Sequence, residues 1–279
     1  MTLATFNAEL SACTTPQELE AVGLWIASHL SPHTRRSYTR IVKGYLESHP
    51  LLTATGKDLI EWRDSLTGSD ASIQLSVSAL KSLFSFLHNL AMIPQNIGAI
   101  LKVPAVHDRL SERILTVDEV GAIIREAYKR DPKYGFAFTL CYYTGLRLEE
   151  LTTVCWRDLS GSVLSVFGKG AKQRYVTLPD WLSAKIELLR GNPDDKIVGV
   201  PARSLEWALK KCAVSVGAPS GTSPHWLRHA NASHALQNNA SIAVVSQTLG
   251  HSNVATTSRY LHIMPGESTG KYLPRLGEV

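Results

Sequence analysis

Apolar residues recur at helical spacing along most of this chain, and this periodicity constrains the possible fold more than any other feature of the sequence. The clearest stripe runs over 72–90, where Ile73, Val77, Leu80 and Leu87 would share one face of a helix. The same spacing predicts further helices over 34–48, 58–66, 136–143, 179–190, 202–216, 224–238, 241–249 and 253–262, and helices that begin at Thr116 and near Arg147. The chain is therefore expected to be mainly α-helical.

In one segment, β-forming residues alternate along the chain instead of recurring at helical spacing. Residues 162–167 and 173–178 alternate β-forming residues on either side of the glycine-containing stretch from Gly168 to Lys172, which is the pattern of an antiparallel hairpin. We therefore predict a mainly α fold that carries one small antiparallel β-sheet.

A linker is predicted over 101–110, because Pro104 biases its neighbour away from helical geometry. We place a domain boundary near 103–112, between a small helical domain over 1–105 and a larger α-rich domain with the sheet over 106–279. The chain has a net charge of +5, and the first 105 residues hold 8 basic and 8 acidic residues, so the whole excess lies in the second domain. An excess of this size is compatible with a polyanionic partner but does not require one.

The sequence disfavours membrane proteins and secreted disulfide scaffolds. No uncharged apolar run approaches the roughly 18 residues that a membrane helix needs, and residues 1–13 lack the basic and apolar regions of a secretory signal. Cys13, Cys141, Cys155 and Cys212 lie far apart without a CxxC motif, which predicts free thiols and argues against a zinc ribbon. We expect a cytoplasmic, nucleoid-associated protein.

The larger domain holds several basic side chains and one tyrosine at positions that suggest chemistry. In chain order these candidates are Arg147, Lys169, His225, Arg228, His251 and Tyr260. His225 and Arg228 are three residues apart on a predicted helix and therefore share a face. Arg147 begins a helix, where backbone amides favour anions. His251 lies in a Leu-Gly-His turn between two helices, and Tyr260 follows nine residues later.

Each candidate taken alone also has an ordinary structural explanation. Lys169 at a hairpin tip is typical of a solvated lysine, and Arg147 can pair with Glu150 three residues later. His225 and His229 are one helical turn apart, which raises the possibility of a metal site, but the glutamate of the HExxH zinc motif is absent between them.

Taken together, the six residues resemble the catalytic set of the tyrosine recombinases, also called the phage integrase family. The resemblance rests on five ordered motifs: Thr144-Gly-Leu-Arg-Leu-Glu-Glu-Leu151, Gly168-Lys-Gly-Ala-Lys-Gln-Arg174, Ser223-Pro-His-Trp-Leu-Arg-His229, Leu249-Gly-His-Ser and Thr256-Thr-Ser-Arg-Tyr260. The spacings of 3, 23 and 9 residues between the last four positions are similar to those of Xer-type members. The first domain resembles the family's core-binding domain, and the likeness covers roughly residues 20–265, with no arm-binding domain expected.

The resemblance implies a site-specific DNA recombinase that acts in integration, excision or resolution of DNA. Tyr260 would attack one strand to form a 3′-phosphotyrosine and release a 5′-hydroxyl, and a second hydroxyl would reverse the step. The resemblance implies His225 as the base that takes the tyrosine proton and Lys169 as the acid that protonates the departing 5′-oxygen.

It also implies a cationic cradle for the phosphate. Arg147 and Arg228 would each offer a planar set of donors to the non-bridging oxygens, and His251 would add another donor. Glu150 would orient Arg147 or a neighbouring histidine. With this much fixed positive charge, the reaction is expected to need no metal or other cofactor.

The implied partner is double-stranded DNA. Recombination needs four strand cleavages, so a tetramer on two DNA sites is expected, together with accessory DNA-bending proteins in some systems. The segment 264–279 is expected to dock on a neighbouring protomer. Candidate phosphate contacts are Arg35, Arg36, Arg40, Lys81, Lys172 and Arg174.

Three other functions are weighed against this one. A type IB topoisomerase-like relaxer would use the same nucleophile and yield relaxed topoisomers instead of recombinants. A sequence-specific DNA-binding protein with a relic site would be unaffected by Tyr260→Phe. A zinc hydrolase would stop turning over in EDTA.

Overall fold

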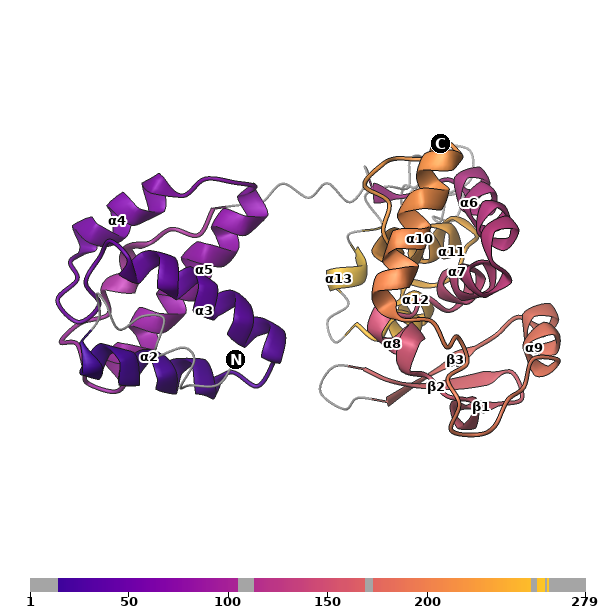
Figure 1. The fold of residues 1–279 in the computed structure, drawn as a ribbon, viewed down its shortest axis with the longest axis horizontal. Coiled ribbons are helices and arrows are strands. Elements are labelled where there is room, and N and C mark those ends of the chain that lie inside the picture. The colour runs from indigo at the N-terminus through magenta and orange to yellow at the C-terminus, as the bar shows by residue number, and fades with distance from the viewer. Residues whose placement is uncertain (1–14, 105–112, 169–172, 252–254, 259, 261–279) are drawn as a thin grey trace, which may run out of the picture. The chain divides into compact units, whose positions relative to one another are not determined.

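The structure of the chain is a computed structural model that describes residues 15–104, 113–168, 173–251, 255–258 and 260 (Figure 1). The chain divides into two compact units, Met1–His107 and Asp108–Val279. The division falls inside the interval 103–112 in which the sequence places the boundary. Within the described residues, no helix is both long and apolar enough to cross a membrane.

The first unit is helical, with helices α2 (Pro16–Ser28), α3 (Pro32–Leu46), α4 (Gly56–Ser65) and α5 (Asp70–Asn89) and the 3-10 turn η1 (Ile97–Ile100). Helix α5 packs against α2, α3 and η1. The core is built on fully buried Trp25, Tyr45, Leu80 and Phe84. The apolar stripe of the predicted helix over 72–90 is therefore the stripe that this unit buries.

Helices α3, α4 and α5 each begin two residues earlier than the apolar pattern predicts. Their N-cap residues Ser31, Thr55 and Ser69 each accept a hydrogen bond from the backbone amide three residues later. This capping extends the helix beyond its first buried residue. Helix α2 was not predicted, although Thr15 and Glu18 form a capping box at its start.

The second unit combines helices with one small sheet. Its elements are α6 (Val117–Arg130), α7 (Pro132–Thr144), α8 (Leu148–Thr153), the 3-10 turn η3 (Trp156–Asp158), β1 (Leu159–Ser160), β2 (Val163–Phe167), β3 (Gln173–Thr177), α9 (Asp180–Glu187), α10 (Ala202–Ser215), α11 (Pro224–Gln237), α12 (Ile242–Leu249) and α13 (Ala255–Ser258). The predicted mainly α fold with a small antiparallel sheet is confirmed.

The sheet has the order β1-β2-β3 with antiparallel neighbours. The predicted hairpin is its β2–β3 pair, in which Val166 lies opposite Arg174. Alternate side chains along β3 point inward, so Arg174 and Val176 are buried. Strand β1 was not predicted, because two residues are too few to show an alternation.

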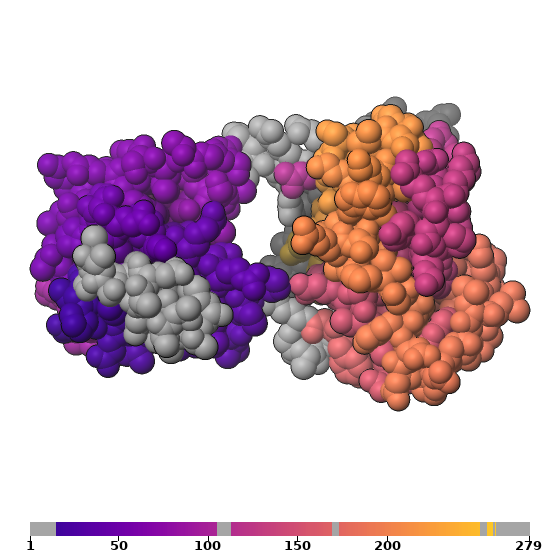
Figure 2. Space-filling view, viewed as in Figure 1, coloured from indigo at the N-terminus to yellow at the C-terminus, as the bar shows by residue number. Residues whose placement is uncertain are grey.

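Helix α11 is the centre of the second unit and contacts α6, α7, α10 and α12. Helices α6 and α10 lie side by side on the face seen in Figures 1 and 2. Leu227 and Ala230 of α11 belong to the main core, while Ala232 and Leu236 pack with Tyr260 in a smaller apolar cluster. One helix therefore joins the main core to the segment that carries the predicted nucleophile.

Two left-handed glycines end the helices that border the candidate site. Gly145 follows α7 with φ of 61°, and a Cβ there would lie 2.7 Å from Leu249 Cδ2. Gly250 follows α12 with φ of 64°, and a Cβ there would lie 2.9 Å from Arg174 Cδ. Both turns require glycine for their backbone conformation and for the close approach of the neighbouring side chain.

Of the predicted helix over 253–262, the structure describes Ala255–Ser258 as helical and Tyr260 as a turn residue. The predicted docking segment 264–279 lies outside the described residues.

Candidate active site

Arg228 on α11 joins three segments at the candidate site. Its Nη1 donates to the backbone oxygen of Gly145, at the end of α7, and its Nη2 donates to the backbone oxygen of Leu249 at 2.7 Å. Only 4% of the residue is exposed. Because these two carbonyls end their helices, the buried guanidinium fixes α11 against both turns.

Two arginines converge on Glu150, the third residue of α8. Arg147 donates to it from its backbone amide at 2.8 Å and from Nη1 at 2.9 Å. Arg174 of β3 forms a bidentate pair with the same carboxylate at 2.8 and 2.7 Å. The Nε of Arg174 also donates to the backbone oxygen of Thr248 at 2.8 Å. The cluster thus links α8, the sheet and the end of α12.

The charges of this cluster shift two pKa values. Burial raises the pKa of Glu150, but hydrogen bonds from Arg174 and Arg147 and the charge of Arg174 lower it more, to about 2. Burial lowers the pKa of Arg228 to about 10, and the charge of Arg147 acts in the same direction. At neutral pH Glu150 is therefore ionised and Arg228 is charged.

His225 is the second residue of α11. It lies one helical turn before His229, on the same face of the helix, and it is exposed. The protein around the ring lowers the pKa of His225, and the positive charges of Arg228 and Arg147 lower it further. The neutral ring is therefore favoured at neutral pH, which is the form that can accept a proton. The charges of Arg147 and Arg228 act on His225, and the charge of Arg147 acts on Arg228.

His251 follows the left-handed Gly250 turn. Its Nδ1 lies 2.7 Å from the hydroxyl of Thr257, so a hydrogen bond joins the end of α12 to α13. This contact fixes the direction of the imidazole through a residue that the sequence does not single out.

Tyr260 is buried, with 4% of its surface exposed, and packs on Ala232, Leu236 and Leu249. Its hydroxyl lies 2.7 Å from Nδ1 of His229. The sequence analysis predicts His225 as the base that takes the proton of this tyrosine, and it considers His229 only as a possible metal ligand. The His225–His229 spacing could have flagged His229, since it places both rings on one face of α11, 6.0 Å apart between centroids.

The side chains predicted to contact phosphates differ in their exposure and in their hydrogen-bond partners. Arg174 was predicted to contact DNA from the hairpin, but it is 8% exposed and its guanidinium is held by Glu150 and Thr248. The reason is its inward-facing position on β3. Lys169 and Lys172 lie outside the described residues.

In the first unit, two of the predicted contacts serve backbone carbonyls. Arg35 donates to the backbone oxygens of Ala27 and His29, at the end of α2. Lys81 Nζ donates to the backbone oxygen of Leu101 at 2.6 Å. The Arg36 and Arg40 side chains are exposed on α3.

We expect Arg228→Lys to slow DNA cleavage by about 10²- to 10³-fold, because an ammonium group cannot serve two carbonyls and a phosphate with one planar set of donors. Single-turnover cleavage at saturating DNA measures the effect. Arg190→Lys is the matched control, since Arg190 is an arginine paired with Glu187 on the protein surface. Cleavage by Arg228→Lys at the wild-type rate would contradict a role at the phosphate.

Comparisons with known proteins show which family the chain belongs to. Residues 113–267 match the model of the phage integrase family, and residues 22–89 match its N-terminal SAM-like domain. A tyrosine recombinase of Thermosipho africanus is 30% identical over 84% of this chain and 93% of its own length. Tyrosine recombinase XerD of Pseudomonas putida is 30% identical over 86% of this chain and 90% of its own length.

Solved structures show the same fold at lower identity. A lambda integrase fragment, in a dimer bound to a core site, has a TM-score of 0.74 at 18% identity and covers 88% of this chain and 94% of its own. A lambda integrase tetramer bound to a Holliday junction has a TM-score of 0.71 at 18% identity, covering 86% and 75%. The family match covers more than half of the chain and holds all six motif residues of the second unit. The chain belongs to the phage integrase family and is a tyrosine recombinase.

Proposed function

We propose that this recombinase cleaves double-stranded DNA at a specific site through a covalent bond between Tyr260 and a 3′-phosphate. The observation that carries the proposal is the geometry around α11, which bears His225 and Arg228: Arg228 donates to the backbone oxygen of Gly145, two residues before Arg147, and His229 of the same helix contacts the Tyr260 hydroxyl. Arg228, held by two carbonyls, and Arg147, held by Glu150, are suited to the charge that a phosphodiester gains under attack.

In the proposed cleavage, the phenolic oxygen of Tyr260 replaces the 5′-oxygen on phosphorus. The phenolic oxygen of Tyr260 bonds to the phosphorus while its proton leaves to a base, the role proposed for His225. The bond from phosphorus to the 5′-oxygen breaks, and that oxygen takes a proton from Lys169. Arg147, Arg228 and His251 stabilise the charge on the non-bridging oxygens.

Rejoining is the same exchange in reverse. A 5′-hydroxyl from the partner duplex attacks the phosphotyrosine and releases Tyr260. The bond energy of the phosphodiester is kept in the phosphotyrosine, so no nucleotide cofactor is required. We propose that four protomers act on two duplexes in the cytoplasm, as the tetrameric state named for a lambda integrase on a Holliday junction suggests.

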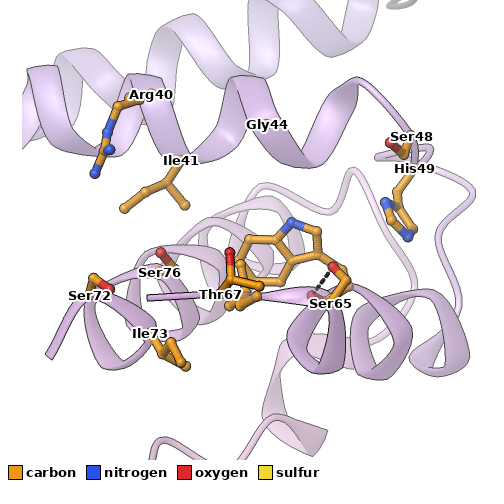
Figure 3. A pocket seen from close by; sticks show the side chains of 12 residues that line it. Arg40, Ile41, Gly44, Ser48, His49, Ser65, Thr67, Ser72, Ile73 and Ser76 are labelled. Atoms are coloured by element: carbon orange, nitrogen blue, oxygen red, sulfur yellow. Dashed lines mark hydrogen bonds between the residues drawn. The ribbon is translucent and has the colours of Figure 1, made fainter. Parts of the chain in front are cut away.

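We propose that the first unit adds phosphate contacts through Arg40. Arg40 lines a hollow of about 380 Å³ between α3 and the start of α5. Figure 3 shows Ser72 and Ser76 of α5 near the same end of the hollow as Arg40. The Ser72 hydroxyl donates to the backbone oxygen of Ser69, so the donors offered to a phosphate oxygen would be the Arg40 guanidinium and the Ser76 hydroxyl.

Arg40→Ala is therefore expected to weaken binding to all DNA sequences alike and to reduce the slope of log affinity against log salt by about 1. Fluorescence anisotropy over a salt series measures this slope. Lys57→Ala is the matched control, because Lys57 is an exposed cation of the same unit that pairs with Glu61 at 3.6 Å. An unchanged slope for Arg40→Ala would exclude Arg40 from the DNA interface.

Covalent capture followed by strand exchange tests the function. The protein is mixed with genomic DNA of its source in EDTA, denatured, and the attached DNA is sequenced. The recovered site is then placed on a labelled short duplex and an unlabelled long duplex. Labelled products of new length support recombination. Relaxed plasmid without such products would indicate a topoisomerase, and specific binding without any adduct would indicate a relic site.

A further inference from the structure

We propose that His229 is a positioning residue for the nucleophile: it holds the Tyr260 hydroxyl through its Nδ1 and thereby sets where the attacking oxygen starts. This inference rests on the proposed role of Tyr260. It assigns a function to a residue of α11 that the phosphate cradle and the proposed acid and base do not include.

The contact is short and lies in a protected place. His229 Nδ1 and the Tyr260 hydroxyl are 2.7 Å apart, and the ring centroids are 5.8 Å apart with a tilt of 49°. The tyrosine ring packs on Leu236, Val245 and Leu249, which leaves 4% of the residue exposed. A hydroxyl in such an apolar cluster needs a polar partner, and the imidazole provides one.

The imidazole itself has a fixed position. His229 follows Arg228 directly, and the Arg228 guanidinium is bonded to the carbonyls of Gly145 and Leu249. These two bonds set the rotation and height of α11 at this turn. The position of the His229 ring therefore depends on the same helix ends that border the phosphate cradle. Through its hydrogen bond, His229 also fixes the position of the Tyr260 hydroxyl.

A second tyrosine–histidine pair on α11 shows what is particular about the first. The hydroxyl of Tyr142, on α7, lies 2.9 Å from Nδ1 of His234, which is five residues further along α11 than His229. The surroundings of His234 shift its pKa through burial and the backbone of Leu115. Tyr260, in contrast, interacts electrostatically with Arg228. The two pairs share their chemistry, but the histidine that contacts Tyr260 is the one that directly follows Arg228 in the chain.

A nucleophile displaced by about 1 Å can lose a factor of about 10² in rate. We therefore expect His229→Ala to slow single-turnover cleavage by about 10²-fold at saturating DNA, with unchanged DNA affinity. His229→Asn is expected to restore most of the rate, because its amide group lies where Nδ1 of the histidine does. The substrate is the site recovered by covalent capture.

Two control variants and one spectrum separate positioning from a structural effect. His234→Ala and Tyr142→Phe disturb the equivalent pair and should cleave near the wild-type rate. In DNA-free protein labelled with ¹³Cζ-tyrosine, His229→Ala should shift the Tyr260 signal and His229→Asn should return it toward the wild-type position. The signal is assigned by its loss in Tyr260→Phe.

Each other result overturns the proposal. Unchanged cleavage by His229→Ala would mean that the bond has no role in the reaction, and faster cleavage would mean that it stores the nucleophile away from the phosphate. Equal defects in the alanine and asparagine variants would make His229 a proton acceptor instead. Cleavage by Tyr260→Phe would refute the nucleophile assignment itself, which is a separate failure.

Discussion

Tyr260→Phe is expected to abolish the covalent protein–DNA adduct while leaving folding and non-covalent DNA binding intact. The phenyl ring keeps the apolar contacts with Ala232, Leu236 and Leu249, and the variant loses the hydrogen bond to His229. Such a bond contributes about 1 kcal/mol to stability, so the fold should persist. The adduct should disappear because no other atom of the side chain can bond to phosphorus.

Denaturing gels of end-labelled DNA measure the adduct, and anisotropy measures binding. Tyr142→Phe is the matched control, since it removes the hydroxyl of the other tyrosine that pairs with a histidine of α11. The control should form wild-type amounts of adduct. Adduct formation by Tyr260→Phe would show that a different residue is the nucleophile.

Glu150→Gln is expected to destabilise the protein by about 3–5 kcal/mol, the typical cost of leaving a buried charge without its partner. Arg174 is 8% exposed and donates two hydrogen bonds to Glu150, at 2.8 and 2.7 Å, so the variant leaves this guanidinium buried beside a neutral amide. Urea unfolding followed by circular dichroism measures the change. Glu149→Gln removes the same charge from an exposed neighbour and should cost less than about 0.5 kcal/mol.

The lowered pKa of Glu150 also predicts that the free energy of unfolding decreases at acidic pH. The folded state lowers the pKa of Glu150 from 4.5 to about 2, so its ionised form stabilises the fold above about pH 4.5. The contribution, of order 3 kcal/mol, should be lost as pH falls from about 4.5 toward 2. Urea midpoints over this range should fall more steeply in wild type than in Glu150→Gln. Parallel curves for the two proteins would contradict the strong pairing of Glu150 with Arg174.

Much of the fold follows from local patterns in the sequence. The stripe over 72–90 predicts α5, and the alternation around residues 168–172 predicts the β2–β3 hairpin, because burial on one face imposes the period of the element. The α12 end at Gly250 also follows from a local signal, a glycine after the last apolar position. Strand β1 and helix α2 are not predicted, because strand pairing and helix capping leave no mark in the apolar period.

The candidate site could be predicted only in part, because its contacts join segments far apart in the chain. The alternation along the hairpin places Arg174 on the same face as Val176, but no spacing in the sequence indicates that its guanidinium reaches Glu150 and Thr248. The contact between His229 and Tyr260 spans 31 residues. Motif order identifies which residues gather at a site, whereas the hydrogen bonds between them depend on how the helices pack.

Peptide mapping of the covalent complex tests the central claim most directly. The captured adduct is trimmed with nuclease and digested with trypsin, which cleaves after Arg259 and after Lys271, so that Tyr260 is the one tyrosine of the resulting peptide. Mass spectrometry should find a nucleotide joined through its 3′-phosphate to Tyr260. A nucleotide on another residue, or one joined through its 5′-phosphate, would contradict the proposed reaction.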